Sequence, residues 1–231
     1  MGGAIEFAVG IVWCVVMINH IQNVSIQLPK VYPITDTAIS GLSHCEQVKR
    51  LIAGGAALIQ LRDKHASSRV FYADAQAALQ VARAAGIKLI INDRVDIALA
   101  LRADGVHLGQ EDMPVEAARR VLGDRAVIGF STHNLEQLQE ALHLPIDYLA
   151  FGPIFPTASK RNPDPVAGLI QLKQACEMVL PMQVVAIGGI NRSNATDVRN
   201  AGANAVAVIS SVLADPSRIS GNLQQMISSI A

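Results

Sequence analysis

The sequence predicts an α/β protein folded as a (β/α)8 barrel, and three observations support this fold. Short β-branched segments alternate with helix-like segments from residue 30 to the C-terminus. Eight such segments recur about every 25 residues, which fits eight strand–helix pairs in one domain. The composition agrees, because 51% of the 231 residues are hydrophobic and only 16% are charged, as expected for a sheet covered by helices.

The elements follow in order along the chain. Strands are expected at residues 31–35, 58–61, 89–92, 105–108, 127–131, 148–151, 184–187 and 205–209. The Ala-rich stretch 71–85 is predicted to be a helix that Gly86 ends, and Pro114 and Pro216 each open a later helix. An open doubly wound sheet is the alternative, although no Gly-x-Gly-x-x-Gly motif follows the first strand.

Residues 4–18 are almost wholly apolar, interrupted by Glu6 and Gly10. This stretch is shorter than the ~20 residues that span a bilayer, and it lacks the basic start and cleavage site of a signal peptide. Three interpretations remain: a helix packed on the domain, a poorly packed extension from an upstream start codon, or a membrane anchor. We therefore expect an N-terminal extension over residues 1–27 and a barrel over 28–231.

Charge and cysteine content exclude several classes of protein. Nineteen Lys and Arg balance nineteen Asp and Glu, so no basic surface for nucleic acid is expected. Cys14, Cys45 and Cys176 are odd in number and far apart, which excludes a disulfide scaffold and, with no export signal, indicates the cytoplasm. Small-molecule substrates are the expected partners, and homo-oligomerisation stays open.

Polar residues follow the predicted strands, where barrel enzymes place their active sites. Gln60, Arg62 and Lys64 are two positions apart, so their side chains share one face of the strand. Two cations and an amide on the same face are suited to binding an anion. The alternative is a solvated rim of weak surface pairs. Three further polar side chains come from other strand ends and loops: Asn92, Ser131 and Lys160.

Asp93 and Asp112 end adjacent predicted strands, and two neighbouring carboxylates call for a cation. Mg²⁺ fits, because it takes one or two carboxylates together with phosphate oxygens and water. His107 and His133 are metal ligands or, as the favoured alternative, core or supporting histidines. Three further acidic residues are expected to be structural or to lie on the rim: Asp63, Asp96 and Glu111.

A second anion site is predicted after the last two strands, the usual phosphate pocket of such barrels. Its backbone N–H groups would come from Gly188, Gly189, Ile209 and Ser210. Thr157 and Ser159 lie between the two sites in chain order and would hydrogen-bond a second substrate. A metal and cations around a diphosphate favour departure of that group.

These segments resemble the thiamine-phosphate synthase family from residue 28 onward. They are 60–64 (QLRDK), 92–93 (ND), 105–112 (GVHLGQED), 129–133 (GFSTH), 152–160 (GPIFPTASK) and 186–190 (AIGGI). The resemblance implies a (β/α)8 transferase that joins hydroxymethylpyrimidine diphosphate to a thiazole phosphate, with diphosphate leaving first. The products would be thiamine phosphate and pyrophosphate.

The resemblance also implies residue roles. The pyrimidine diphosphate would be held by Gln60, Arg62, Lys64, Asn92, Ser131 and Lys160, of which Arg62, Lys64, Ser131 and Lys160 are the catalytic candidates. Mg²⁺ would be held by Asp93 and Asp112. The thiazole phosphate would be held by Thr157, Ser159, Gly189, Ile209 and Ser210.

Three departures and two alternatives qualify the resemblance. The apolar stretch over residues 4–18 is not part of the family core. Residues 161–165 contain two prolines where a flexible loop is expected, and Phe130 replaces a commonly smaller residue. A thiazole tautomerase-like barrel is one alternative, although such relatives tend to lack the diphosphate residues. The other is a non-catalytic phosphate-ligand sensor or membrane-tethered scaffold, which only the N-terminal stretch supports.

Overall fold

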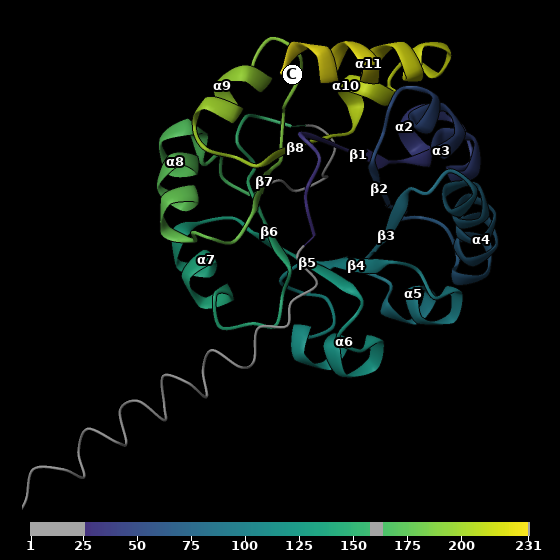
Figure 1. Ribbon diagram of the computed structural model, residues 1–231, viewed down its shortest axis with the longest axis horizontal. Helices are drawn as coiled ribbons and strands as arrows, with labels where there is room; N and C mark the ends of the chain where they lie inside the picture. The colour runs from purple at the N-terminus through teal and green to yellow at the C-terminus, as the bar shows by residue number, and fades with distance from the viewer. Residues whose placement is uncertain (1–25, 158–163, 231) are drawn as a thin grey trace, which may run out of the picture.

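Eight parallel strands form a closed barrel in the computed structural model, which describes residues 26–157 and 164–230 (Figure 1). Each strand pairs with its neighbour in sequence, and β8 returns to pair with β1. The strands are β1 (Val31–Thr35), β2 (Leu58–Leu61), β3 (Lys88–Asn92), β4 (Gly105–Leu108), β5 (Val127–Thr132), β6 (Tyr148–Phe151), β7 (Val184–Ala186) and β8 (Ala205–Val208). This closure confirms the predicted fold and excludes the open sheet.

The helices form an outer ring around the strands (Figure 1). They are α2 (Thr37–Ser40), α3 (His44–Ala53), α4 (Ser68–Ala84), α5 (Val95–Leu101), α6 (Val115–Leu122), α7 (Leu135–Ala141), α8 (Gly168–Met178), α9 (Ala195–Asn200), α10 (Ser210–Leu213) and α11 (Ile219–Ser229), with the 3₁₀ helix η1 (Pro216–Arg218) before the last.

Capping explains where the helices differ from the predicted limits. α4 begins three residues earlier than expected because Ser67 accepts a hydrogen bond from a backbone N–H of the first turn. Gly86, with φ of 70°, follows its last turn as predicted. Pro114 is the residue before α6 rather than its first, and Pro216 opens η1, after which α11 continues.

Two apolar layers result from the alternation of side chains along each strand. In β2, Leu58 packs inside the barrel, whereas Ile59 and Leu61 pack against the surrounding helices. Phe130 of β5 belongs to the same outer layer, so this departure from the family lies away from the barrel interior. The interior therefore holds a small core of its own beneath the strand ends.

Ile26 and Leu28 pack into this interior core ahead of β1, with 5% and 8% of their surfaces exposed. Gln183 holds them by donating to Ile26 O and accepting from Leu28 N, both at 2.9 Å. The predicted apolar stretch 4–18 lies outside the described residues. Within the described ranges no helix combines the length and apolar character that crossing a bilayer requires.

Gly105 should tolerate no side chain, because a Cβ there would lie 2.0 Å from Val127 O of the neighbouring strand. We expect Gly105→Ala to lower the free energy of unfolding by about 3 kcal/mol or more. Gly221→Ala in α11 is the matched control, since its Cβ would enter open space and alanine favours helix by up to ~1 kcal/mol. Urea unfolding of both variants tests this; equal stabilities would contradict it.

Candidate active site

Polar side chains line the carboxyl-terminal end of the barrel. Gln60 and Asn92 are 2% and 8% exposed at interior positions of β2 and β3, and Ser131 occupies an interior position of β5. Because all eight strands are parallel, their carboxyl ends open on one side. The structure thus brings these three predicted residues to a single mouth.

Asp93 and Asp112 lie together at this mouth. Asp93 directly follows β3, adopts a left-handed φ of 61°, and donates its N–H to His107 O at 2.9 Å. Asp112 accepts a hydrogen bond from Gly109 N at 2.6 Å. Burial and the nearby Asp93 carboxylate raise the pKa of Asp112, although the Gly109 hydrogen bond opposes this rise. The predicted carboxylate pair is therefore formed in space.

This donor set fits Mg²⁺ better than a metal that needs a closed protein cage. Among residues 26–157 and 164–230, no group of three or more His, Cys, Asp or Glu side chains could hold a metal. Mg²⁺ needs only one or two carboxylates when phosphate oxygens and water supply its other ligands. The pair Asp93 and Asp112 meets that requirement.

Both predicted cations of the β2 loop have acidic partners. Lys64 Nζ pairs with Asp93 Oδ2, and Arg62 Nη1 donates to Asp36 Oδ2 at 2.6 Å. Asp36 follows β1, so it reaches the mouth by the same strand-end rule as the other site residues. The two cations thus face the mouth while their charges are balanced by neighbouring carboxylates.

Asp63 anchors the loop that carries these cations. Its carboxylate accepts hydrogen bonds from Thr37 Oγ1 at 3.0 Å and from the backbone N–H groups of His65 and Ala66 at 2.8 Å, and it lies 3.3 Å from His44 Nε2. Burial alone would raise the pKa of Asp63, but these hydrogen bonds outweigh it and hold the pKa below its usual value. Asp63 was expected to be structural or to lie on the rim, and these contacts match the structural alternative.

The glycines after β7 are required by packing. A Cβ on Gly188 would lie 2.6 Å from Pro153 Cα, and a Cβ on Gly189 would lie 2.5 Å from Pro156 O. Both glycines also have positive φ, of 101° and 66°. The sequence argument linked their missing side chains to a phosphate, and the structure adds a second reason, the close approach of the loop after β6.

The remaining predicted residues of the second anion site fall into two groups. Ile209 and Ser210 lie where β8 gives way to α10, and Thr157 ends the described part of the loop after β6. Ser159 and Lys160 lie outside the described residues, as does most of the proline-containing segment that departs from the family.

The two histidines at the mouth support neighbouring groups. His107 is buried, with Nδ1 2.9 Å from the Tyr148 hydroxyl and Nε2 2.8 Å from Ser131 Oγ. His133 Nδ1 lies 2.7 Å from Gly152 O, and its Nε2 lies 3.5 Å from Asp164 Oδ2. Both side chains match the supporting role that was favoured over metal ligation.

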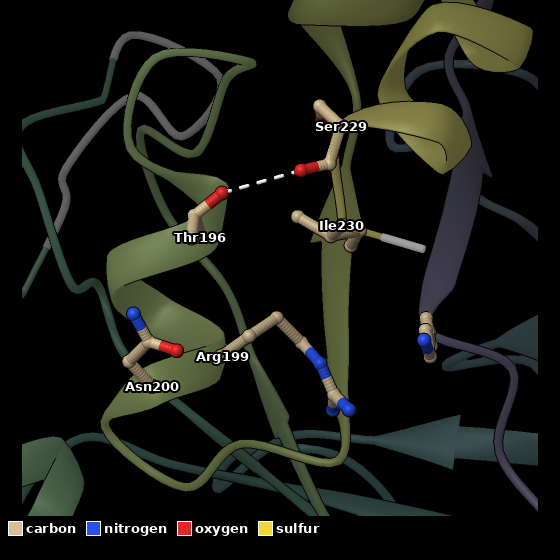
Figure 2. A pocket seen from close by; sticks show the side chains of 6 residues that line it. Thr196, Arg199, Asn200, Ser229 and Ile230 are labelled. Carbon is tan, nitrogen blue, oxygen red and sulfur yellow. Dashed lines mark hydrogen bonds between the residues drawn. The ribbon is translucent and has the colours of Figure 1, made fainter.

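A separate cavity of about 310 Å³ lies at the other end of the barrel (Figure 2). It is lined by Lys30, Thr196, Arg199, Asn200, Ser229 and Ile230. Thr196 Oγ1 donates across it to Ser229 O at 3.3 Å. Lys30 precedes β1 and α9 ends before β8, so this cavity lies at the amino ends of the strands, away from the mouth.

Comparisons with known proteins agree with the geometry. Residues 31–212 match the family described as thiamine monophosphate synthase. The chain belongs to this family. A thiamine-phosphate synthase from Chloroflexus aurantiacus is 46% identical over 80% of this chain and 85% of its own length. One from Koribacter versatilis is 43% identical over 88% and 98%.

A solved structure gives the same result. Thiamine phosphate pyrophosphorylase from Pyrococcus furiosus superposes with a TM-score of 0.76 at 37% identity, over 87% of this chain and 96% of the other. The predicted resemblance to the thiamine monophosphate synthase family is therefore confirmed.

Several residues at or beneath the mouth were not predicted from the sequence. Asp36 could have been found, because it directly follows a predicted strand. Tyr32 and Tyr148 touch through their hydroxyls at 3.1 Å although 116 positions separate them, so no local pattern links them. His44 was also missed, because it begins α3 while its partners Thr35 and Asp63 lie at the ends of two strands.

The buried His107 should make stability depend on pH. Burial lowers its pKa to about 4, although the Asp112 carboxylate opposes this shift, so the unfolded chain binds the proton more readily. Stability is then complete above about pH 6.5 and falls by about 3 kcal/mol as the pH drops toward 4. Urea unfolding at several pH values should show a shallower decline for His107→Asn.

His143→Asn is the control, because it removes an exposed histidine. We expect it to keep the wild-type decline. If His107→Asn also kept that decline, the buried neutral state of His107 would be refuted.

Proposed function

We propose that this chain is a thiamine-phosphate synthase. It would join 4-amino-2-methyl-5-(diphosphooxymethyl)pyrimidine to 4-methyl-5-(2-phosphoethyl)thiazole, or to the carboxylated form of that thiazole, and release pyrophosphate. The observation that carries the proposal is the Asp93–Asp112 pair with Lys64 beside it, because this arrangement suits a metal-assisted diphosphate leaving group.

Asp93 and Asp112 would hold Mg²⁺, which when bound neutralises negative charge on the departing diphosphate. Arg62, Lys64 and Lys160 would bind the diphosphate oxygens. Asn92 would hydrogen-bond the same substrate, while Gln60 and Ser131 would orient its pyrimidine ring. Loss of diphosphate leaves a cation that the aminopyrimidine delocalises, and the thiazole nitrogen then attacks it.

Lys64 would change partners during this cycle. In the structure its ammonium pairs with Asp93. If Asp93 held Mg²⁺, the ammonium of Lys64 would be available to pair with the diphosphate oxygens. Lys64 would therefore offset the charge of the carboxylate pair before substrate binds and stabilise the leaving group afterwards.

The thiazole phosphate would lie on the side of β6 to β8. We propose that Thr157, Ser159 and Gly189 bind it, together with Ile209 and Ser210 at the turn into α10. A thiazole tautomerase-like activity is the alternative, and the retained diphosphate residues disfavour it. We further propose that the enzyme acts in the cytoplasm on small molecules without a nucleic-acid partner.

Asp93→Asn should abolish most Mg²⁺-dependent turnover. Asparagine tolerates the left-handed backbone of this position, so the change removes charge and leaves the fold intact. We expect pyrophosphate release from the two substrates to fall at least about a hundredfold. Asp124→Asn, an exposed position before β5, should keep the wild-type rate.

Two results would contradict the proposal. One is the absence of pyrophosphate release from the wild-type protein with both substrates and Mg²⁺. The other is a normal rate for Asp93→Asn at all Mg²⁺ concentrations. Isomerisation of the thiazole without pyrophosphate release would support the tautomerase alternative instead.

A further inference from the structure

A chain of hydrogen bonds crosses the barrel interior beneath the mouth. Gln60 Nε2 donates to the Tyr32 hydroxyl at 3.3 Å, and that hydroxyl lies 3.1 Å from the hydroxyl of Tyr148. The Tyr148 hydroxyl lies 2.9 Å from His107 Nδ1, and His107 Nε2 lies 2.8 Å from Ser131 Oγ. Five side chains from five strands thus connect Gln60 with Ser131.

The middle of this hydrogen-bonded chain is tightly packed and closed to water. Tyr32 is 1% exposed and Tyr148 is fully buried. The Tyr148 ring stacks on His107 with centroids 5.5 Å apart and planes at 25°. A Cβ on Gly129 would lie 2.1 Å from Tyr148 Cζ and 2.5 Å from His107 Nδ1, so the missing side chain makes room for this pair.

The hydrogen bonds of this series all run in one direction, with each donor closer to Gln60 and each acceptor closer to Ser131. The amide nitrogen of Gln60 can only donate, so the Tyr32 hydroxyl accepts there and donates its proton to Tyr148. Tyr148 then donates to Nδ1 of the neutral His107 ring, which carries its single N–H on Nε2.

That N–H donates to Ser131 Oγ, and the hydroxyl proton of Ser131 stays available to a group in the mouth. Reversing any one link would leave a buried hydroxyl without an acceptor, which is costly.

We propose that Tyr148, Tyr32 and His107 are positioning residues that fix the hydrogen-bonding direction of Gln60 and Ser131, and thereby orient the aminopyrimidine of the diphosphate substrate. This inference rests on the proposed function, in which Gln60 and Ser131 bind that ring. Within residues 26–157 and 164–230, none of the five side chains of this series hydrogen-bonds to Gly189 or Ser210, so loss of these hydrogen bonds should affect one substrate and spare the other.

Tyr148→Phe tests the proposal, because phenylalanine keeps the ring that fills the space beside Gly129 and removes only the hydroxyl. The KM for the pyrimidine diphosphate should rise about three- to tenfold, while the KM for the thiazole phosphate stays unchanged. Tyr32→Phe should have a smaller effect, since the Tyr148–His107–Ser131 part of the chain persists.

Tyr72→Phe, on the outer helix α4, is the matched control and should change neither KM. His107→Gln should retain more affinity for the pyrimidine diphosphate than His107→Ala, because the Gln amide can still donate to Ser131. The proposal is overturned if Tyr148→Phe changes both KM values equally, changes neither, or lowers only the unfolding midpoint. If Tyr148→Phe does not fold, Tyr32→Phe and the two His107 variants decide by the same comparison.

Calorimetric titration of the pyrimidine diphosphate separates this proposal from the proposed function. If the wild-type protein binds this ligand without turnover, the proposed synthase activity fails while the positioning effect is still measured. A wild-type protein that binds the ligand no more tightly than Tyr148→Phe overturns the positioning role even when turnover is normal.

Discussion

The arrangement of charges at the mouth of the barrel depends on the repulsion between two neighbouring carboxylates. Asp93 and Asp112 lie close enough that Asp93 contributes to the raised pKa of Asp112, so both carboxylates stay ionised more readily with a cation beside them. In the structure Lys64 is that cation, because its ammonium pairs with Asp93. The placement of Lys64 follows from this pair, and the proposed divalent ion and anionic leaving group rest on the same pair.

The side chains inside the barrel change from polar near this charged end to apolar at the opposite end. Ile26 and Leu28 fill the amino-terminal end, where the Gln183 side chain satisfies one backbone group of each. Above them, a buried polar layer is satisfied internally, because each hydroxyl and imidazole nitrogen has a partner along the chain from Gln60 to Ser131. Such a layer costs little when complete and much when interrupted, so it rigidifies the floor of the site.

The local sequence pattern was sufficient to predict the strands and the residues that follow them, because both can be recognised within a few consecutive residues. Gln60, Asn92, Asp93 and Asp112 were found in this way. The contact between Tyr32 and Tyr148 was not, since it depends on which strands face each other across a closed barrel. The functional roles of the four residues found in this way stay predictions, as do those of Ser159 and Lys160.

The segment after β2 shows how one alternation serves two purposes. Gln60, Arg62 and Lys64 share a parity, and all three have partners that lie inside the barrel or at its mouth. Leu61 and Asp63 have the opposite parity: Leu61 packs under the helices, and Asp63 bonds to Thr37, to His44 and to its own loop. The residues that anchor the loop are therefore interleaved with those that face the ligand. A one-residue shift would exchange them, so the register of β2 fixes both the position of the cations and the rigidity of their support.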